Sequence, residues 1–292
     1  MPRAHDELDL YFAKSEVRVF SEYDLKELRA PNKTEWRVGD SVRNDAFFAI
    51  LKNAGLRRIV LSSKKYPPIT RFAMSDASQF QVALSLRRGA YISHGSAAYL
   101  HGFSTALPAI FANKEQTPKE SSTELTQQSI DQAFLRKPRS SNLRYHQKVS
   151  GQRLAYVLLN GKSTDNLGVI WLDHPVAGRV PATNVARTLI DITVRPQYCE
   201  GPLGIVRAFA IARTKGLVRA KELLEILTGL EHTYPYHQAL GFVIEKAGFP
   251  AAEAEVLKSL GLGLDFDFYL AYDMARPRYD RRWRIYYPSN FD

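Results

Sequence analysis

The residues best placed to do chemistry are two carboxylates near the end of the chain. Residues 264–273, LDFDFYLAYD, alternate between apolar and polar residues, which is typical of a half-buried strand. The alternation predicts that Asp265 and Asp267 lie side by side on one face of that strand. Neighbouring carboxylates can hold a magnesium ion and activate a water molecule. A magnesium-dependent DNA nuclease that uses Asp265 and Asp267 is therefore one hypothesis.

A second interpretation makes the same carboxylates structural. If the segment WRIYYP, residues 283–288, forms an antiparallel hairpin with the first strand, Arg282 and Arg284 stand opposite the two aspartates as ion-pair partners. Nuclease sites of this kind usually add a lysine close to an acidic residue. The pattern Asp/Glu-x-Lys occurs only at residues 24–26, in a different predicted element. We therefore prefer the ion pairs and expect no catalytic residue, with the nuclease as the alternative.

Other catalytic and metal-binding patterns are missing. His94 and His101 in YISHGSAAYLHGF can share a helix face, but no acidic or cysteine partner accompanies them at ligand spacing. The single cysteine, Cys199, excludes an internal disulfide framework and a cysteine-rich metal site. Phosphate-loop, dinucleotide-binding and nucleophile-elbow signatures are absent. We expect no bound metal and no cofactor.

The positive charge of the chain is clustered. The formal net charge is +10, and residues 37–65 hold seven Lys or Arg against two Asp or Glu. Residues 136–148 hold five cations and no carboxylate, and residues 276–284 hold five Arg against one Asp. Basic patches attract polyanions through counterion release, and this favours a nucleic-acid partner over three merely solvated faces.

The first cluster falls on a recognisable order of elements. FSEYDLKEL (20–28) predicts a short helix with Ser21 as N-cap and Asp24 as the capping-box acid. A second helix is predicted to begin at about residues 40–41 and to end at Gly55, and LRRIVLSS and ITRFAMS then predict a two-stranded hairpin. Helix, loop, helix and hairpin is the order of a winged helix-turn-helix.

That architecture assigns roles to the cations. The second helix of such a unit enters the major groove of DNA with its N-terminal residues at the base edges, while flanking elements hold phosphates. We expect Arg43 and Asn44 to contact bases, because Arg suits guanine and Asn suits adenine. The expected backbone contacts are Arg37, Lys52, Arg57, Arg58, Lys64 and Lys65. A protein-interaction module remains a third hypothesis.

The rest of the chain predicts a larger mixed α/β unit. RLAYVLLNGKS and NLGVIWLDH predict two buried strands, Thr183 is the expected cap of the helix in VPATNVARTLIDI, and residues 201–260 predict several helices. We expect an α/β (α+β) protein with a winged helix-turn-helix at 1–85 and a mixed α/β domain at 86–292. The start of the chain has no apolar signal core and no apolar run exceeds six residues, so we expect a cytoplasmic protein without a membrane partner.

Several of these segments resemble a known family, the AbiEi antitoxins of type IV toxin–antitoxin systems and phage abortive infection. The resemblance covers nearly the whole chain in order: FSEYDLKEL with the following helix and wing, YISHGSAAYLHGF, ARTLIDI, TYPYHQALGFVIEKAG, and FDFYLAYD with WRIYYP. Ala186 stands where the family commonly has an acidic residue, so a role for that acid does not transfer.

The resemblance implies a function that the residues alone do not. A member of this family is expected to repress its own operon by binding inverted repeats through the N-terminal winged helix. It is also expected to be the antitoxin that counteracts a nucleotidyltransferase toxin, without a stable complex between the two proteins. The clusters at 136–148 and 276–284 would then extend the DNA footprint.

Overall fold

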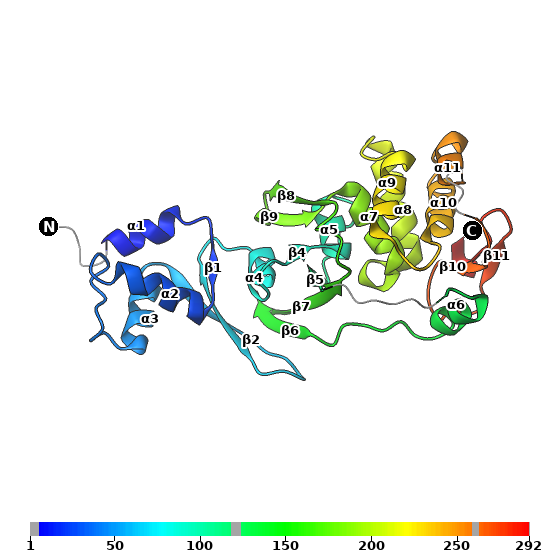
Figure 1. Ribbon diagram of the computed structural model, residues 1–292. Helices are drawn as coiled ribbons and strands as arrows, with labels where there is room; N and C mark the ends of the chain where they lie inside the picture. Colours follow the sequence, from blue (N-terminus) through cyan, green and yellow to red (C-terminus); the bar gives the residue numbers. More distant parts are fainter. Residues whose placement is uncertain (1–5, 118–123, 259–262, 292) are drawn as a thin grey trace.

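The computed structural model describes residues 6–117, 124–258 and 263–291, and these form a mixed α/β fold. Figure 1 shows an elongated arrangement, with a winged helix-turn-helix at one end, a larger sheet in the middle, and a helical layer followed by a small sheet at the other end. The predicted fold class is confirmed.

The winged helix-turn-helix contains the predicted helices and hairpin together with a helix that the sequence did not reveal. Its elements are Asp6–Lys14 (α1), Val19–Phe20 (β1), Glu22–Asn32 (α2), Asn44–Asn53 (α3), Leu56–Leu61 (β2) and Ile69–Met74 (β3). The hairpin of β2 and β3 is antiparallel, and β1 adds a third strand beside β3. Only Leu8 and Phe12 of α1 are buried, so its apolar periodicity is too sparse to predict a helix.

The predicted helix ends are partly right. Ser21 and Asp24 form the expected capping box of α2, but the helix runs for 11 residues instead of ending early. The start of α3 was placed too early, because Arg43 is extended (φ −63°, ψ 156°) and is itself the N-cap residue. Gly55 ends this segment as predicted, with φ at +89°.

A six-stranded mixed sheet forms the middle of the molecule. Its strands are Tyr91–Ile92 (β4), Ala109–Glu115 (β5), Arg144–Val149 (β6), Gln152–Gly161 (β7), Val169–His174 (β8) and Gly178–Thr183 (β9). Their order across the sheet is β6-β7-β5-β4-β9-β8. Alternate residues of β5 and β7 face opposite sides: Ile110 and Leu158 join the N-terminal core, whereas Phe111 and Val157 pack with Tyr198 on the other face.

Two expectations about this sheet are wrong. Of the two strands expected to be buried, β7 lies inside the sheet, but β8 lies at its edge and Trp171 is 65% exposed. Thr183 does not cap the next helix, because it is the last residue of β9, and Asn184 accepts the capping hydrogen bond from the Arg187 amide instead. The segment GRVPAT (β9) was not recognised as a strand, because Pro181 interrupts its alternation of apolar and polar residues.

Helices surround the two faces of the sheet and continue beyond it. They are Gln79–Ser85 (α4), His94–Leu100 (α5), Gln127–Phe134 (α6), Val185–Val194 (α7), Gly201–Thr214 (α8), Ala220–Leu230 (α9), Tyr236–Lys246 (α10) and Ala251–Lys258 (α11). A short 3₁₀ turn, Pro196–Tyr198, links α7 to α8. The helical pattern predicted for 201–260 is confirmed over the described part of that range.

The C-terminal sheet differs from the expected hairpin. Its strands are Phe268–Tyr269 (β10), Arg278–Asp280 (β11) and Ile285–Tyr287 (β12), in the order β10-β12-β11. The prediction of an antiparallel pair was wrong, because β10 and β12 are parallel and β11 takes the antiparallel place beside β12. Residues 268–270 are all buried, so the apparent alternation does not correspond to one long strand.

The N-terminal core does not stop at the predicted boundary of residue 85. One continuous cluster joins Phe12, Trp36 and Phe47 of the winged unit to Phe80 of α4 and Tyr156 of β7. A second cluster packs the helices α7–α11 against β10 and β12. The described residues form no helix long and apolar enough to cross a membrane.

The contact between Gly241 and Trp283 gives a test of the C-terminal packing. Trp283 is fully buried, and a Cβ on Gly241 of α10 would lie 2.1 Å from its ring. We expect Gly241→Ala to lower the free energy of unfolding by about 2–3 kcal/mol through overpacking, measured by urea denaturation. Gly39→Ala is the control, because no heavy atom lies within 4 Å of the position of its Cβ. An unchanged stability of Gly241→Ala would contradict this packing.

Candidate nucleic-acid interface

A buried arginine holds the loop that precedes α3. The Arg29 side chain donates from Nε to the Val38 carbonyl at 3.1 Å and from Nη2 to the Gly39 and Val42 carbonyls at 2.6 Å each. Its guanidinium also lies 5.0 Å from the ring centroid of Phe47, the buried anchor of α3. The long loop is thus fixed by one side chain of α2, and the start of α3 is fixed with it.

The N-terminus of α3 is exposed and borders a groove. Arg43 and Asn44 are both exposed, and they line a groove of about 740 Å³ between α2 and α3. Lys26 of α2 and Lys33, the residue after its last turn, line the same groove, although neither was a predicted contact residue. Asp45 lies 3.4 Å from the Arg43 guanidinium, so the surface predicted to read bases also carries a carboxylate. A carboxylate there suits the amino group of cytosine and repels phosphate.

The other predicted contact residues are exposed but do not form one group. Lys52 lies at the far end of α3, and Arg37 lies in the loop with a left-handed backbone (φ 53°). Arg58 pairs in register with Phe72, whose ring stacks on Phe48, so Arg58 lies on the α3 side of the hairpin. Arg57 points to the opposite face, as the alternation of a strand requires.

The wing is attached to the central sheet. The backbones of Ser62 and His146 exchange two hydrogen bonds, of 3.0 and 2.8 Å, which join the end of β2 to β6. Lys65 Nζ donates to Asn142 Oδ1 at 3.1 Å, and the Tyr66 ring lies against Tyr145. The tip of the hairpin is therefore held against the segment that carries the second basic cluster.

This attachment merges cations from two parts of the sequence. Exposed cations surround His146, and we call this surface the wing face. Its cations are Lys64, Lys65, Arg144, Lys148 and Arg153. Burial lowers the pKa of His146, and the nearby charges of Arg153, Arg144 and Lys64 lower it further. Lys64 and Lys148 belong to separate clusters in the sequence, because the paired Ser62 and His146 are 84 positions apart.

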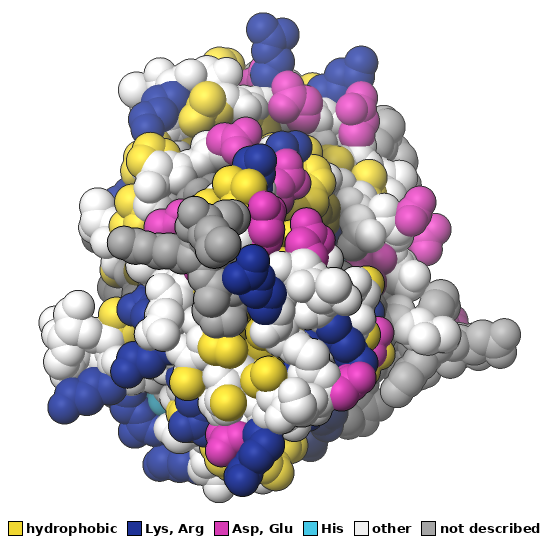
Figure 2. Space-filling model, turned by 90° about the vertical axis from the view of Figure 1, so that its left-hand side faces the viewer, with side chains coloured by type: hydrophobic (Ala, Val, Ile, Leu, Met, Phe, Trp, Pro, Cys, Tyr) yellow, Lys and Arg dark blue, Asp and Glu magenta, His cyan; other side chains and the backbone are white. Residues whose placement is uncertain are grey.

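The distribution of charge over this end of the molecule is uneven. Figure 2 looks onto the end formed by α1–α3, and many of the Lys and Arg side chains lie in its lower half, where Figure 1 has α3 and the hairpin. Most of the Asp and Glu side chains lie above them, and α1 contributes Asp6, Glu7 and Asp9 in its first turn. The basic side of this end is therefore the side that carries α3 and the wing.

The third basic cluster lies elsewhere. The strands β10–β12 are at the opposite end of the molecule from α1–α3, so residues 276–284 are remote from the wing face. Two of its arginines are engaged: Arg282 pairs with Glu245 and Glu255, and Arg284 pairs with Asp267. The expected pairing of Arg282 with Asp265 is therefore wrong, because α10 and α11 supply its carboxylates.

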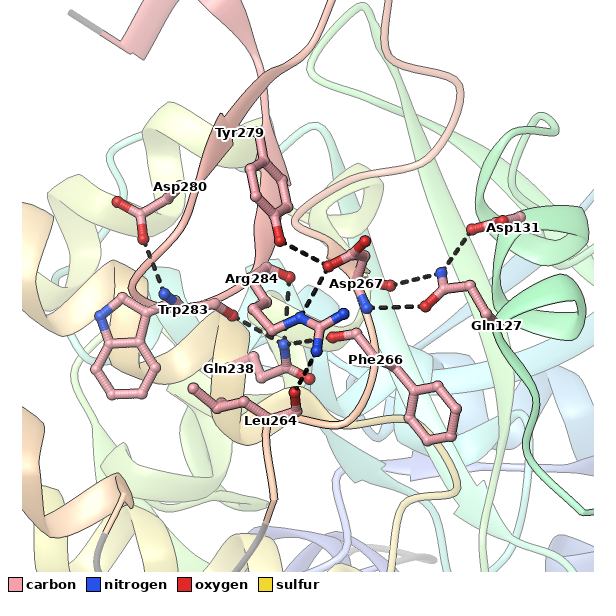
Figure 3. A network of polar contacts seen from close by, with 10 residues as sticks. All are labelled: Gln127, Asp131, Gln238, Leu264, Phe266, Asp267, Tyr279, Asp280, Trp283 and Arg284. Atoms are coloured by element: carbon pink, nitrogen blue, oxygen red, sulfur yellow. Dashed lines mark hydrogen bonds and ion pairs between the residues drawn. The ribbon is translucent and has the colours of Figure 1, made fainter.

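Asp267, a candidate for metal binding, is at the centre of a structural network (Figure 3). Its Oδ1 accepts hydrogen bonds from the Tyr279 hydroxyl at 2.6 Å and from Arg284 Nε at 2.9 Å. Its backbone amide and carbonyl are paired with the side-chain amide of Gln127 on α6. The ion pair between Asp267 and Arg284 was predicted from the sequence and is confirmed.

The electrostatics of Asp267 agree with a structural role. Partial burial alone would raise the pKa of its carboxyl, but the hydrogen bonds from Tyr279 and Arg284 hold the pKa below its ordinary value. Asp265 is exposed, two residues before Asp267. Among the described residues, no group of three or more His, Cys, Asp or Glu is arranged to hold a metal ion.

The two histidines that suggested a metal site have separate environments. His101 Nε2 is 2.7 Å from the Thr183 carbonyl, at the junction with β9. His94 is buried against Phe111 and Tyr198, and Ser93 Oγ lies 2.8 Å from its Nδ1. His94 also has a left-handed backbone (φ 52°) at the first residue of α5, which is uncommon for a residue other than glycine.

Asp267 gives a prediction about stability. Asp267→Ala removes the acceptor of the Tyr279 and Arg284 hydrogen bonds, both on partly exposed groups. We expect a loss of about 1–2 kcal/mol in the free energy of unfolding, measured by urea denaturation. Asp265→Ala, at an exposed position, should change stability much less. Equal effects of the two substitutions would refute the structural role of Asp267.

The pH dependence of stability gives a prediction for His94. Burial lowers the pKa of His94 to about 4. The negative charge of Asp191 opposes this shift, and the positive charges of Arg187 and Arg195 add to it. The unfolded chain therefore binds a proton that the folded chain does not, and stability should fall as pH falls from 6.5 to about 4. The contribution is about 3 kcal/mol at most. His94→Asn keeps a residue that tolerates the left-handed backbone, and it should flatten this dependence in unfolding curves. Above pH 7 the difference between the two proteins should be constant.

The comparisons with known proteins bear on the fold alone. No family model and no curated protein matches this sequence. Among solved structures, the RV2827C protein from Mycobacterium tuberculosis is similar at a TM-score of 0.55 and 13% identity, over 98% of this chain and 92% of that one. The described architecture is therefore similar over nearly its whole length to that of a solved protein.

Proposed function

We propose that this protein is a DNA-binding transcriptional repressor and the antitoxin of a type IV toxin–antitoxin system. The observation that carries the DNA-binding part is the wing face, where the hairpin that follows α3 meets β6 and two basic segments of the sequence share one surface. The antitoxin part rests on the resemblance to the AbiEi family.

The arrangement suits a duplex docked against α3. The N-terminus of α3, with Arg43 and Asn44, would enter the major groove, and Arg29 would keep the loop before it in place. Lys52 lies in the last turn of the same helix and Arg58 on the hairpin beside it, and Lys64 and Lys65 stand on the wing as phosphate contacts. Arg57 points away from α3 and contributes least to this mode of docking.

The proposed partners follow from the family. The DNA is the set of inverted repeats in the protein's own operator, and the antitoxin counteracts a nucleotidyltransferase toxin without a stable complex. In this proposal the protein acts in the cytoplasm in antiviral defence, with no membrane partner, no cofactor and no catalysis. Because inverted repeats are read by two copies of a winged helix, each of the two copies would place its α3 in one half-site.

The wing lysines test the electrostatic part of the proposal. In fluorescence anisotropy with the upstream DNA of its own gene, Lys64→Ala with Lys65→Ala should weaken binding to all sequences and reduce the slope of log K against log salt by about 2. The matched control is Lys215→Ala with Lys221→Ala, two exposed lysines of the helical layer. A salt slope equal to that of the unsubstituted protein would count against the wing.

The same assay separates base readout from charge. Asn44→Ala should relax the preference among operator variants with little change in salt slope, and Asn53→Ala at the other end of α3 serves as the control. Weak DNA binding even at low salt would favour the protein-interaction module. Plasmid cleavage in magnesium that is lost in Asp267→Ala would overturn the proposal in favour of the nuclease.

A further inference from the structure

A polar cavity lies on the face of the central sheet that is turned away from the winged helix-turn-helix. It has a volume of about 520 Å³ and is lined by the ends of β5 and β7, by α7, and by the chain before α10. Its walls come from segments as far apart in sequence as Asn113, Arg187 and His232. The volume is in the range of small-molecule sites.

The lining carries an excess of positive charge. Four cations line the cavity, Arg139, Lys162, Arg187 and Arg195, and the carboxylate among the lining residues is Asp191. Arg187 and Asp191 are buried and paired at 2.9 Å, whereas Arg139 is exposed at the rim. Asp191 faces Arg187, and Lys162 is paired with Glu231 at 3.6 Å. The charges of Arg139 and Arg195 therefore favour an anionic occupant.

Several buried polar atoms in this region lack a partner. In the part of the chain that the structure describes, Asn113 Oδ1, Asp191 Oδ2 and His232 Nε2 make no hydrogen bond. Leaving such an atom unpaired in the folded protein costs about 1–3 kcal/mol. Three of them around one cavity suit a polar ligand, and the carboxylate and amide oxygens would accept hydrogen bonds from donors on it.

The walls also offer neutral rings. Burial lowers the pKa of His94 and of His232 to about 4, so both imidazoles are uncharged at neutral pH. Tyr198, Tyr234 and Tyr236 line the same space. Aromatic side chains of this kind can stack on a nucleobase. A neutral imidazole also has one hydrogen-bond donor and one hydrogen-bond acceptor.

The frame around the cavity is tightly packed. A Cβ on Gly95 would lie 2.3 Å from the Tyr198 carbonyl oxygen, and a Cβ on Gly161 would lie 3.0 Å from Asn113 Oδ1. The ring of His94, whose backbone is left-handed, lies 5.4 Å from the ring of Tyr198. The polar groups of the cavity are therefore kept in fixed positions, as a binding site requires.

We propose that this cavity binds a nucleoside monophosphate. The phosphate would lie at the rim between Arg139 and Arg195, and the hydroxyl and amino groups of the nucleoside would donate to Asp191 Oδ2 and Asn113 Oδ1. The tyrosine rings would contact the base. This site is separate from the wing face and does not depend on the proposed function.

The test is calorimetric titration of the full-length protein with AMP, GMP, CMP and UMP, and with inorganic phosphate and ribose 5-phosphate. At least one nucleotide should bind saturably, with one molecule per chain. Arg139→Glu should weaken it by about tenfold or more, because the rim charge is reversed. Arg136→Glu, at an exposed cation outside the lining, should bind like the unsubstituted protein.

A second set of variants separates this cavity from the DNA surface. Lys64→Ala with Lys65→Ala should leave nucleotide affinity unchanged, and loss of affinity in that variant would place the nucleotide on the wing face and overturn the proposal. Equal affinity for ribose 5-phosphate or phosphate alone would overturn the assignment of a nucleoside. Absence of binding by every nucleotide would overturn the proposal. Asp191→Asn should also weaken binding, with folding checked by circular dichroism.

Discussion

The guanidinium of Arg29 is the contact on which the N-terminal surface depends. It donates hydrogen bonds to three carbonyls of the loop between α2 and α3 and lies over the ring of Phe47. A loop of this length would otherwise cost considerable conformational entropy to fix. One side chain of α2 thus fixes the start of α3. The predicted base-contacting residues, Arg43 and Asn44, therefore depend on Arg29, which is itself buried.

The wing is continuous with the central sheet rather than a free hairpin. The backbone bridge between Ser62 and His146 and the contact of Lys65 with Asn142 bring like charges together. Gathering cations on one surface has an electrostatic cost in the free protein, and a polyanion relieves it. A charge distribution that looks unfavourable in isolation is thus consistent with a partner of opposite sign. The core cluster that crosses residue 85 provides the rigid support for it.

Local patterns in the sequence were sufficient for local features. The capping box of Ser21 and Asp24, the hairpin of β2 and β3, and the ion pair of Asp267 with Arg284 were all predicted, because each depends on short-range spacing or charge. The parallel pairing of β10 with β12 was not predicted, because β11 lies between them in the sequence, whereas in the sheet β12 is the central strand. The polar cavity was missed because its residues come from distant segments. The one local signal was Arg187 and Asp191 at helical spacing within an otherwise apolar helix.

Strand β7 runs from the wing face to the polar cavity. Arg153 lies near its beginning, and Gly161, its last residue, lines the cavity. Ten extended residues span roughly 30 Å, several times the screening length of about 8 Å in physiological salt. Charges at the two ends therefore do not sense each other through solvent. Strand β7 is therefore one direct covalent connection between an anion in the cavity and a polyanion on the wing.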